Sequence, residues 1–182
     1  MPILSIIYMI AHESGGRERG VRSTNPVKHR CKSALAQQNN FWKDKKKMDE
    51  ELLVVIKDFL EMGHVDNIVA MFHRHHEYYV LTGAILDDER FNVRLGVSVL
   101  FEELKKREPE ELDRATSSLQ PLLKSDKPHI RGEAICILGI IGSKAACDSI
   151  KTMLEDKQPQ IREVAADILA ELGCNWDSQH DS

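Results

Sequence analysis

The residues Ser125-Asp126-Lys127-Pro128-His129-Ile130-Arg131 have a second version in Glu155-Asp156-Lys157-Gln158-Pro159-Gln160-Ile161-Arg162. The arginines that end the two stretches lie 31 positions apart, and the residues between them have the pattern helix, short turn, helix. A fixed period of about 20 to 50 residues is typical of a solenoid, in which each helix pair buries its apolar face only against its neighbours. We therefore predict an all-α fold, an α-solenoid (α-α superhelix) of about three to four helix pairs.

A weaker third copy comes earlier, as Asp87-Asp88-Glu89-Arg90-Phe91-Asn92-Val93-Arg94. Here the spacing from arginine to arginine is 37, and the six extra residues fit in the charged stretch Lys105–Glu111. The turns carry Asp, Ser or Asn, whose side chains accept hydrogen bonds from the free N–H groups at a helix start. The β-branched residue before each arginine begins a buried stripe of helical spacing. In the last two copies this stripe continues as Ala134, Ile137, Leu138 and Ile141, and as Ala165, Ile168, Leu169 and Leu172.

Composition and length agree with a helical repeat chain. The 182 residues, of which 42% are hydrophobic and 30% charged, are expected to form one small domain. Six prolines, ten glycines and few aromatics favour helices over strands. Short breaks separate the helices, so consecutive helices should run antiparallel. The expected helices are Asp49–Met62, Val65–His73, Glu77–Leu86, Arg90–Lys106, Pro109–Leu123, Pro128–Ile141, Ser143–Glu155 and Pro159–Leu172.

The turns resemble the HEAT-like repeats of the phycobilisome-lyase type. The resemblance rests on Asp, Pro, Ile or Val and then Arg, followed by a helix that ends near Leu-Gly, as at Leu138-Gly139 and Leu172-Gly173. It covers about Tyr79–Gly173 clearly and Met48–His76 only by helical pattern. In that family Arg and Asp form a ladder between adjacent repeats, so the resemblance implies structural rather than catalytic charges. The implied ladder residues are Asp88, Arg94, Asp126, Arg131, Asp156 and Arg162.

An enzymatic branch shares this repeat type. The iron-dependent deoxyhypusine hydroxylases place several His-Glu pairs just after the Ile/Val-Arg turn. The corresponding positions here are Leu95-Gly96, Gly132-Glu133 and Glu163-Val164, which lack the imidazoles that a di-iron centre needs. A phycobilin lyase activity would rest on the family name alone. We therefore expect no enzyme and no cofactor, and keep a hydroxylase- or lyase-related enzyme as the alternative.

The cluster His73-Arg74-His75-His76-Glu77 is the strongest candidate for metal chemistry. On a continuous helix His73 and His76 share a face, and Glu77 lies beside His73. Imidazole pairs at this spacing can hold zinc, nickel or iron. The favoured interpretation is nevertheless a solvated helix junction, so His73, His76 and Glu77 are only weak candidates for metal ligands. A pH-sensitive contact is a further alternative.

The four cysteines, Cys31, Cys136, Cys147 and Cys174, show no C-x-x-C spacing. This usage favours unpaired thiols in a reducing cytosol over a disulfide framework or a zinc site. We therefore predict a cytoplasmic protein. A nucleophilic cysteine would need a neighbouring base and a positive environment, and the sequence indicates neither.

The ends of the chain differ from its middle. Residues 1–47 hold ten Lys or Arg against three acids, a net charge of +7, which leaves −11 for the rest of a chain whose total is −4. We expect residues 1–47 to be a disordered basic leader and residues 174–182 a flexible tail, on either side of a solenoid at 48–173. Because Met48 opens directly on an acidic helix start, the leader can equally be a translated extension that is not native. Its apolar run Ile3–Ala11 is too short to span a membrane.

The predicted concave side decides between nucleic acid and protein as partner. The outward positions of the second helices carry no Lys or Arg, and the region has a net charge of −11, so a phosphate backbone would be repelled. Only the basic N-terminal arm offers an alternative nucleic-acid contact. We therefore predict a non-catalytic protein-binding scaffold or adaptor for a basic or amphipathic partner, with a homodimer left open and no membrane contact. The candidate partner-binding residues are Glu102, Ile135, Cys136, Glu163 and Asp167.

Overall fold

The computed structural model describes residues 49–174, and within them every regular element is a helix, which confirms the predicted all-α solenoid. The predicted basic leader and residues 175–182 of the predicted tail lie outside the described residues. Residues 49–61 form the first described helical segment. The following elements are α3 (Val65–Arg74), the 3₁₀ helix η1 (His76–Leu81), α4 (Thr82–Leu86), α5 (Phe91–Arg107), η2 (Pro109–Ala115), α6 (Thr116–Leu119), η3 (Gln120–Lys124), α7 (Pro128–Ile141), α8 (Lys144–Lys151), η4 (Thr152–Glu155) and α9 (Pro159–Glu171).

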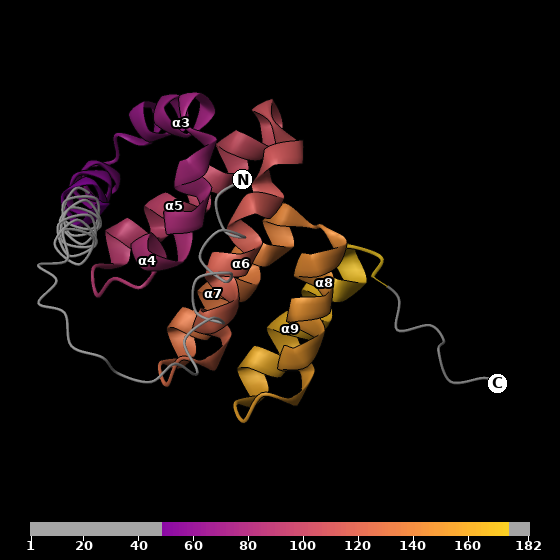
Figure 1. Ribbon diagram of the computed structural model, residues 1–182. Helices are drawn as coiled ribbons and strands as arrows, with labels where there is room; N and C mark the ends of the chain where they lie inside the picture. The colour runs from indigo at the N-terminus through magenta and orange to yellow at the C-terminus, as the bar shows by residue number, and fades with distance from the viewer. Residues whose placement is uncertain (1–48, 175–182) are drawn as a thin grey trace, which may run out of the picture. The chain divides into compact units, whose positions relative to one another are not determined.

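The helices form two layers, which Figure 1 shows as a progression from indigo to yellow along the stack. In one layer α5 packs against α7, and α7 packs against α9. In the other layer α4 packs against α6, and α8 follows with its 3₁₀ extension η4. Each α4-, α6- or α8-containing segment pairs with the long helix that follows it. The described chain therefore holds three complete repeats, preceded by the 49–61 helix and by α3, which packs against α5.

The first helix of each repeat is not a continuous α-helix, which differs from the prediction. The expected helix Pro109–Leu123 is divided into η2, α6 and η3. Pro121 has no N–H to donate and its ring clashes with the preceding turn, so the α-helical ladder cannot continue through it. Thr82 and Thr152 each donate a hydroxyl hydrogen bond to the carbonyl three residues earlier, at 2.8 and 2.7 Å. Such bonds compete with the regular backbone ladder, and both threonines stand where α- and 3₁₀-helical segments meet.

Two glycines allow the repeats to pack closely. A Cβ atom added to Gly83 would lie 2.0 Å from the carbonyl oxygen of Ser118, on the next repeat. One added to Gly139 would lie 2.7 Å from the Cγ2 atom of Ile168 on α9. The contact at Gly83 is with backbone, so this position requires glycine, whereas a side chain at position 139 would force Ile168 to shift. The Leu-Gly ending of α7 is thus a packing feature of the repeat.

Candidate functional site

Three equivalent turns connect the two layers. The residues Asp88, Ser125 and Asp156 each accept, through a side-chain oxygen, a hydrogen bond from the backbone N–H two positions later, at 2.9, 3.3 and 2.8 Å. The carbonyl of each also accepts a hydrogen bond from the arginine six positions later, at 2.9, 2.9 and 2.8 Å. Those arginines are Arg94, Arg131 and Arg162. The turn is therefore closed twice, once by its own side chain and once by an arginine from the helix it introduces.

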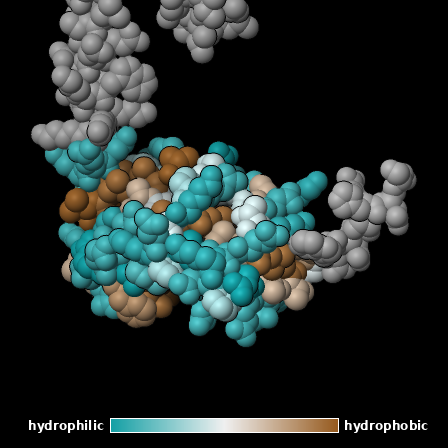
Figure 2. Space-filling model, turned by 90° about the horizontal axis from the view of Figure 1, so that it is seen from below, coloured by the Kyte–Doolittle hydropathy of each residue, from teal (hydrophilic) through white to brown (hydrophobic). Residues whose placement is uncertain are grey.

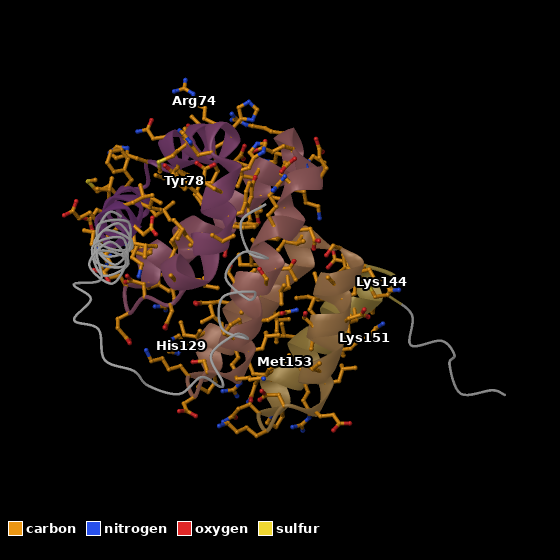
Figure 3. The ribbon with its side chains drawn as sticks, viewed as in Figure 1. Arg74, Tyr78, His129, Lys144, Lys151 and Met153 are labelled. Carbon is orange, nitrogen blue, oxygen red and sulfur yellow. A yellow bond between two sulfur atoms is a disulfide. The ribbon has the colours of Figure 1, made fainter. Side chains whose placement is uncertain are left out.

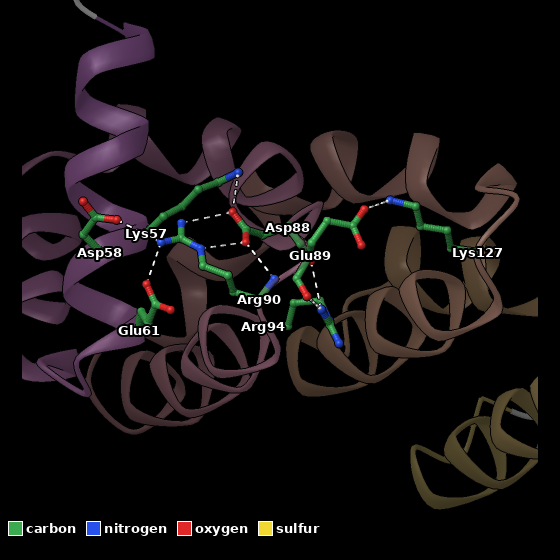
Figure 4. Close-up of polar contacts among 8 residues, drawn as sticks. All are labelled: Lys57, Asp58, Glu61, Asp88, Glu89, Arg90, Arg94 and Lys127. Atoms are coloured by element: carbon green, nitrogen blue, oxygen red, sulfur yellow. Dashed lines mark hydrogen bonds and ion pairs between the residues drawn. The ribbon is translucent and has the colours of Figure 1, made fainter.

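In two of these turns the carboxylate also forms an ion pair with a basic side chain from the preceding repeat unit. Lys57 Nζ lies 3.2 Å from Asp88 Oδ2 (Figure 4), and Arg131 forms two bonds to Asp156, at 2.7 and 2.8 Å. Both carboxylates have a lowered pKa, because Arg90 and Arg131 respectively donate side-chain hydrogen bonds to them. Arg90 extends the first cluster by bonding Asp58 at 2.9 Å and Glu61 at 2.6 Å. These pairs hold the repeats together.

The predicted ladder is wrong at Asp126. This residue is exposed and forms no ion pair within residues 49–174, because the ladder position of its turn is Ser125, one residue earlier. Arg94 instead donates to Glu133 Oε1 on α7, at 3.0 Å. Arg162 bonds only the backbone carbonyl of Asp156 and pairs with no carboxylate in the described structure. The Arg131–Asp156 pair alone matches the predicted connection between repeats.

The exposed surface of α5, α7 and α9, which we call the long-helix face, carries most of the predicted partner-binding residues. Glu102, Glu163 and Asp167 are exposed, and none of them forms an ion pair within the described residues. Ile135 is 0% exposed, so its assignment to the binding surface is wrong: it faces the core of the stack, about 100° around α7 from Cys136. Desolvation, and then the Glu133 carboxylate, raise the pKa of the Cys136 thiol, which makes Cys136 a poor nucleophile.

An apolar stripe on α5 adds to this face. Phe91, Leu95 and Val99 are 62%, 50% and 38% exposed, and their i, i+4, i+8 spacing places them in one row along the helix. Figure 2 shows that apolar surface occurs in separate areas of this view, one of them at its left, in a largely hydrophilic exterior. Phe91 belongs to the turn motif in the sequence, and the structure places it at the start of this row.

The histidine cluster is organised differently from the prediction. His73 Nδ1 lies 3.0 Å from Glu108 Oε2, and His76 Nε2 lies 3.4 Å from the same oxygen. Glu77 is directed elsewhere and pairs with His75, at 3.2 Å, so its assignment beside His73 and His76 is wrong. The chain kinks between α3 and η1, which removes the continuous helix on which that expectation depended. Glu108 comes from the junction of α5 and η2, 35 residues from His73, and could not be found from local spacing.

Two further side chains complete the surroundings of Glu108. Tyr79 donates its hydroxyl to Glu108 Oε1 at 3.1 Å, and Glu111 Oε2 lies 3.2 Å from His76 Nδ1. Burial, and then the charge of Glu108, raise the pKa of the Tyr79 hydroxyl, so it stays protonated as a donor. The Glu108 side chain is only 7% exposed, whereas that of His73 is 69% exposed. The cluster therefore has a buried carboxylate at its base and an imidazole at its rim.

Comparison with known families matches residues 80–170, half of the chain, to HEAT repeats. The chain belongs to the HEAT repeat family. The matched residues begin in η1 and end within α9, so they cover almost all of the three complete repeats. The chain has no significant match among curated proteins or among solved structures. HEAT repeats typically mediate protein interactions and are generally non-catalytic.

A disulfide closes the last HEAT repeat. Cys147 on α8 and Cys174 after α9 are bonded to each other, with a Cα–Cα distance of 6.4 Å. The prediction of unpaired thiols is therefore wrong for these two residues, because the α8–α9 hairpin brings together cysteines that are 27 positions apart. Cys136 is the free cysteine of the described region. Since stable disulfides are typical of oxidising compartments, the predicted cytoplasmic location stays a prediction that this bond does not support.

Basic and acidic side chains occur in both layers of the HEAT repeats. Lys144 and Lys151 project from α8 away from the helix stack, as Figure 3 shows at the right of the view. Acidic side chains that form no ion pair among the described residues occur in both layers, as Glu110 and Glu155 in the outer layer and as Glu102, Glu163 and Asp167 on α5 and α9. None of the helices within residues 49–174 has the length and apolar character needed to span a bilayer.

Proposed function

We propose that this HEAT repeat protein is a non-catalytic scaffold that binds a basic, amphipathic helix on its long-helix face. The exposed row Phe91, Leu95 and Val99 carries the proposal, because it is an apolar stripe of helical spacing on a rigid helix. Apolar anchors in such a row fit the i, i+3, i+4, i+7 side chains of a partner helix. The turn motif with its Leu-Gly helix endings supports placing these repeats in the phycobilisome-lyase type.

The charges of the same face favour a basic partner. Glu102 lies on α5 beside the apolar row, while Glu163 and Asp167 lie two helices away on α9. All three are exposed and form no ion pair within residues 49–174, although Glu102 interacts electrostatically with Lys106, one turn along α5. Complementary charge steers association and excludes like-charged partners. A second copy of the same face would bring carboxylates together, so a homodimer through this face is disfavoured.

A direct test uses a synthetic helical peptide of leucines and lysines, with the leucines at i, i+3, i+4 and i+7, and a second peptide in which glutamate replaces every lysine. We expect the full-length protein to bind the lysine peptide, with an affinity that falls as salt shortens the Debye length. Leu95→Glu should weaken binding at least tenfold, and Glu163→Lys with Asp167→Lys should weaken it severalfold. Fluorescence anisotropy measures both affinities.

The matched control is Val80→Glu, because Val80 is 58% exposed on η1, in the other layer. This variant should bind the lysine peptide as the wild type does. Equal binding of both peptides, or an equal loss with Leu95→Glu and Val80→Glu, would contradict the proposed face. Surface substitutions of this kind usually change stability by less than about 0.5 kcal/mol, so circular dichroism should show all variants folded.

A further inference from the structure

The side chains around Glu108 meet the spacing that a metal ion requires. One ring nitrogen of His73, one of His76 and one Glu108 oxygen all lie within 4.8 Å of one another. The two imidazole nitrogens are 3.0 and 3.4 Å from Glu108 Oε2. Metal–ligand bonds of about 2.0–2.2 Å in tetrahedral geometry separate neighbouring ligand atoms by about 3.3–3.5 Å. We propose that His73, His76 and Glu108 form a binding site for a divalent transition-metal ion, with zinc as the ion that best fits the donors.

Two neighbouring side chains orient the ligand atoms. Glu111 Oε2 lies 3.2 Å from His76 Nδ1, while His76 Nε2 lies 3.4 Å from Glu108 Oε2. Tyr79 donates to Glu108 Oε1, which leaves Oε2 directed at the two imidazoles. A carboxylate that holds the second nitrogen of a ligating histidine is a recurring feature of metal sites, where it fixes the tautomer and orients the ring.

One atom of the cluster points specifically to a cation. His76 Nε2 is buried and has no hydrogen-bond partner among the described residues. This nitrogen lies 3.4 Å from Glu108 Oε2, beyond the usual range of an N–H···O hydrogen bond. A metal ion between the two atoms would bind both, and it would also bind His73, whose Nδ1 lies 3.0 Å from the same oxygen.

The donor set selects among metals. Two imidazoles and one carboxylate are the ligands of many zinc sites, whereas calcium and magnesium prefer oxygen ligands alone. Because His73 is 69% exposed, a fourth position of a tetrahedral ion would face solvent and take a water molecule. The ion would tie α3 and η1 to the junction of α5 and η2. We therefore assign it a structural role, which does not rest on the proposed binding of a partner helix.

The experiment is a titration of tag-free, full-length protein, first freed of metal with a chelator, with zinc chloride in a calorimeter. We expect one equivalent to bind with a dissociation constant in the micromolar range or tighter, and the thermal midpoint to rise on binding. Cobalt(II) chloride in place of zinc should give the visible absorption of a tetrahedral site. His73→Ala and His76→Ala should each weaken zinc binding at least tenfold and reduce this absorption.

His75→Ala is the matched control, because His75 belongs to the same segment but pairs with Glu77 instead of Glu108. It should keep the affinity and the cobalt spectrum of the wild type. Glu108→Gln tests the buried ligand; should this variant fail to fold, the exposed His73 still decides the question. The proposal is overturned if no stoichiometric zinc binds, or if His75→Ala weakens binding as much as His73→Ala. It is also overturned if zinc binds with unchanged affinity in all the ligand variants.

Discussion

The two junctions between successive complete HEAT repeats hold a buried arginine in different ways. At the second junction Arg131 is 2% exposed, and its guanidinium makes two parallel bonds to Asp156. At the first junction Arg94 is 8% exposed and donates to one oxygen of Glu133, on the next long helix. The difference arises at a single ladder position, which is Asp156 in the third repeat and Ser125 in the second. The arginine is the constant element of the repeat, and its carboxylate partner can come from the turn or from the following helix.

The two arrangements should differ in strength. A buried guanidinium needs a charged partner, because removing a charge from water is costly. A two-bond fork between Arg and a carboxylate fixes both groups in one geometry, whereas a single bond leaves the longer Glu side chain free to turn. The side chains confirm this order of burial: that of Asp156 is 7% exposed and that of Glu133 is 26% exposed. We therefore expect the second junction to be the more stable of the two.

The largest expected difference between the two junctions is in the stability that is lost when each carboxylate is removed. Asp156→Ala leaves Arg131 buried without its partner and should cost about 3–5 kcal/mol of the free energy of unfolding. It also removes the hydrogen bond to the backbone N–H of Gln158, which adds to the loss. Glu133→Ala should cost only about 1–2 kcal/mol, because Arg94 keeps two backbone carbonyls as acceptors.

Urea unfolding followed by circular dichroism measures both losses. Arg162→Ala serves as the control, since Arg162 is exposed and bonds only a carbonyl, and it should change the free energy of unfolding by less than about 0.5 kcal/mol. Equal losses for Asp156→Ala and Glu133→Ala would show that the two-bond geometry adds nothing.

The disulfide offers a second contrast, because it strengthens only the last repeat. Cys147 and Cys174 enclose a loop of about 27 residues, for which the chain-entropy relation gives about 3.5 kcal/mol. Replacing both cysteines by serine should lower the free energy of unfolding by about 2–4 kcal/mol under oxidising conditions. Adding a thiol reductant to the wild type should produce a similar loss and leave the double variant unchanged.

Cys136→Ser is the control for that experiment, because Cys136 is a free thiol and its replacement should not alter the response to the reductant. A wild-type protein whose stability is the same with and without reductant would contradict a stabilising disulfide. The result also bears on where the protein is located, because a disulfide stabilises a protein only in a compartment that keeps it oxidised.

The repeat architecture could be predicted from the sequence because it follows from local rules. The turn motif and the apolar period predicted α7 with the bounds that the structure has, Pro128–Ile141, and the short breaks predicted the stacking of neighbours. Pro121 was visible too, but its effect on the helix that contains it was not anticipated. Phe91 lies inside the turn motif, which obscures its role, but its i, i+4, i+8 spacing with Leu95 and Val99 is enough to predict the apolar row.

The errors concern contacts between residues that are distant in the chain. Glu108 reaches the histidines from the far end of α5, and Cys147 meets Cys174 only because α8 and α9 fold back on each other. The family resemblance implies a carboxylate at the ladder and therefore points to Asp126, whereas the structure has Ser125 at the equivalent position. One residue of register separates the two, and on a turn this changes the direction of the side chain. The sequence spacing to the arginine therefore predicts the ladder position better than the residue type does. This spacing is six residues in all three repeats.

The smallest expected effect comes from giving the first junction the ladder carboxylate that the second junction has. Ser125→Asp places a carboxylate at the ladder position, where Asp can also replace the serine as the acceptor for the backbone N–H of Lys127. In the wild type this change should have little effect, because Arg94 already bonds Glu133. In the Glu133→Ala background it should recover about 0.5–1 kcal/mol of the lost stability, since Arg94 regains a charged acceptor.

A double-mutant cycle in urea isolates this interaction from the separate effects of the two changes. Ser125→Asn is the matched control: it preserves the turn bond without the charge and should recover less. If Asp and Asn restore stability equally, the gain comes from the turn alone, and the ladder position does not face Arg94 across the first junction.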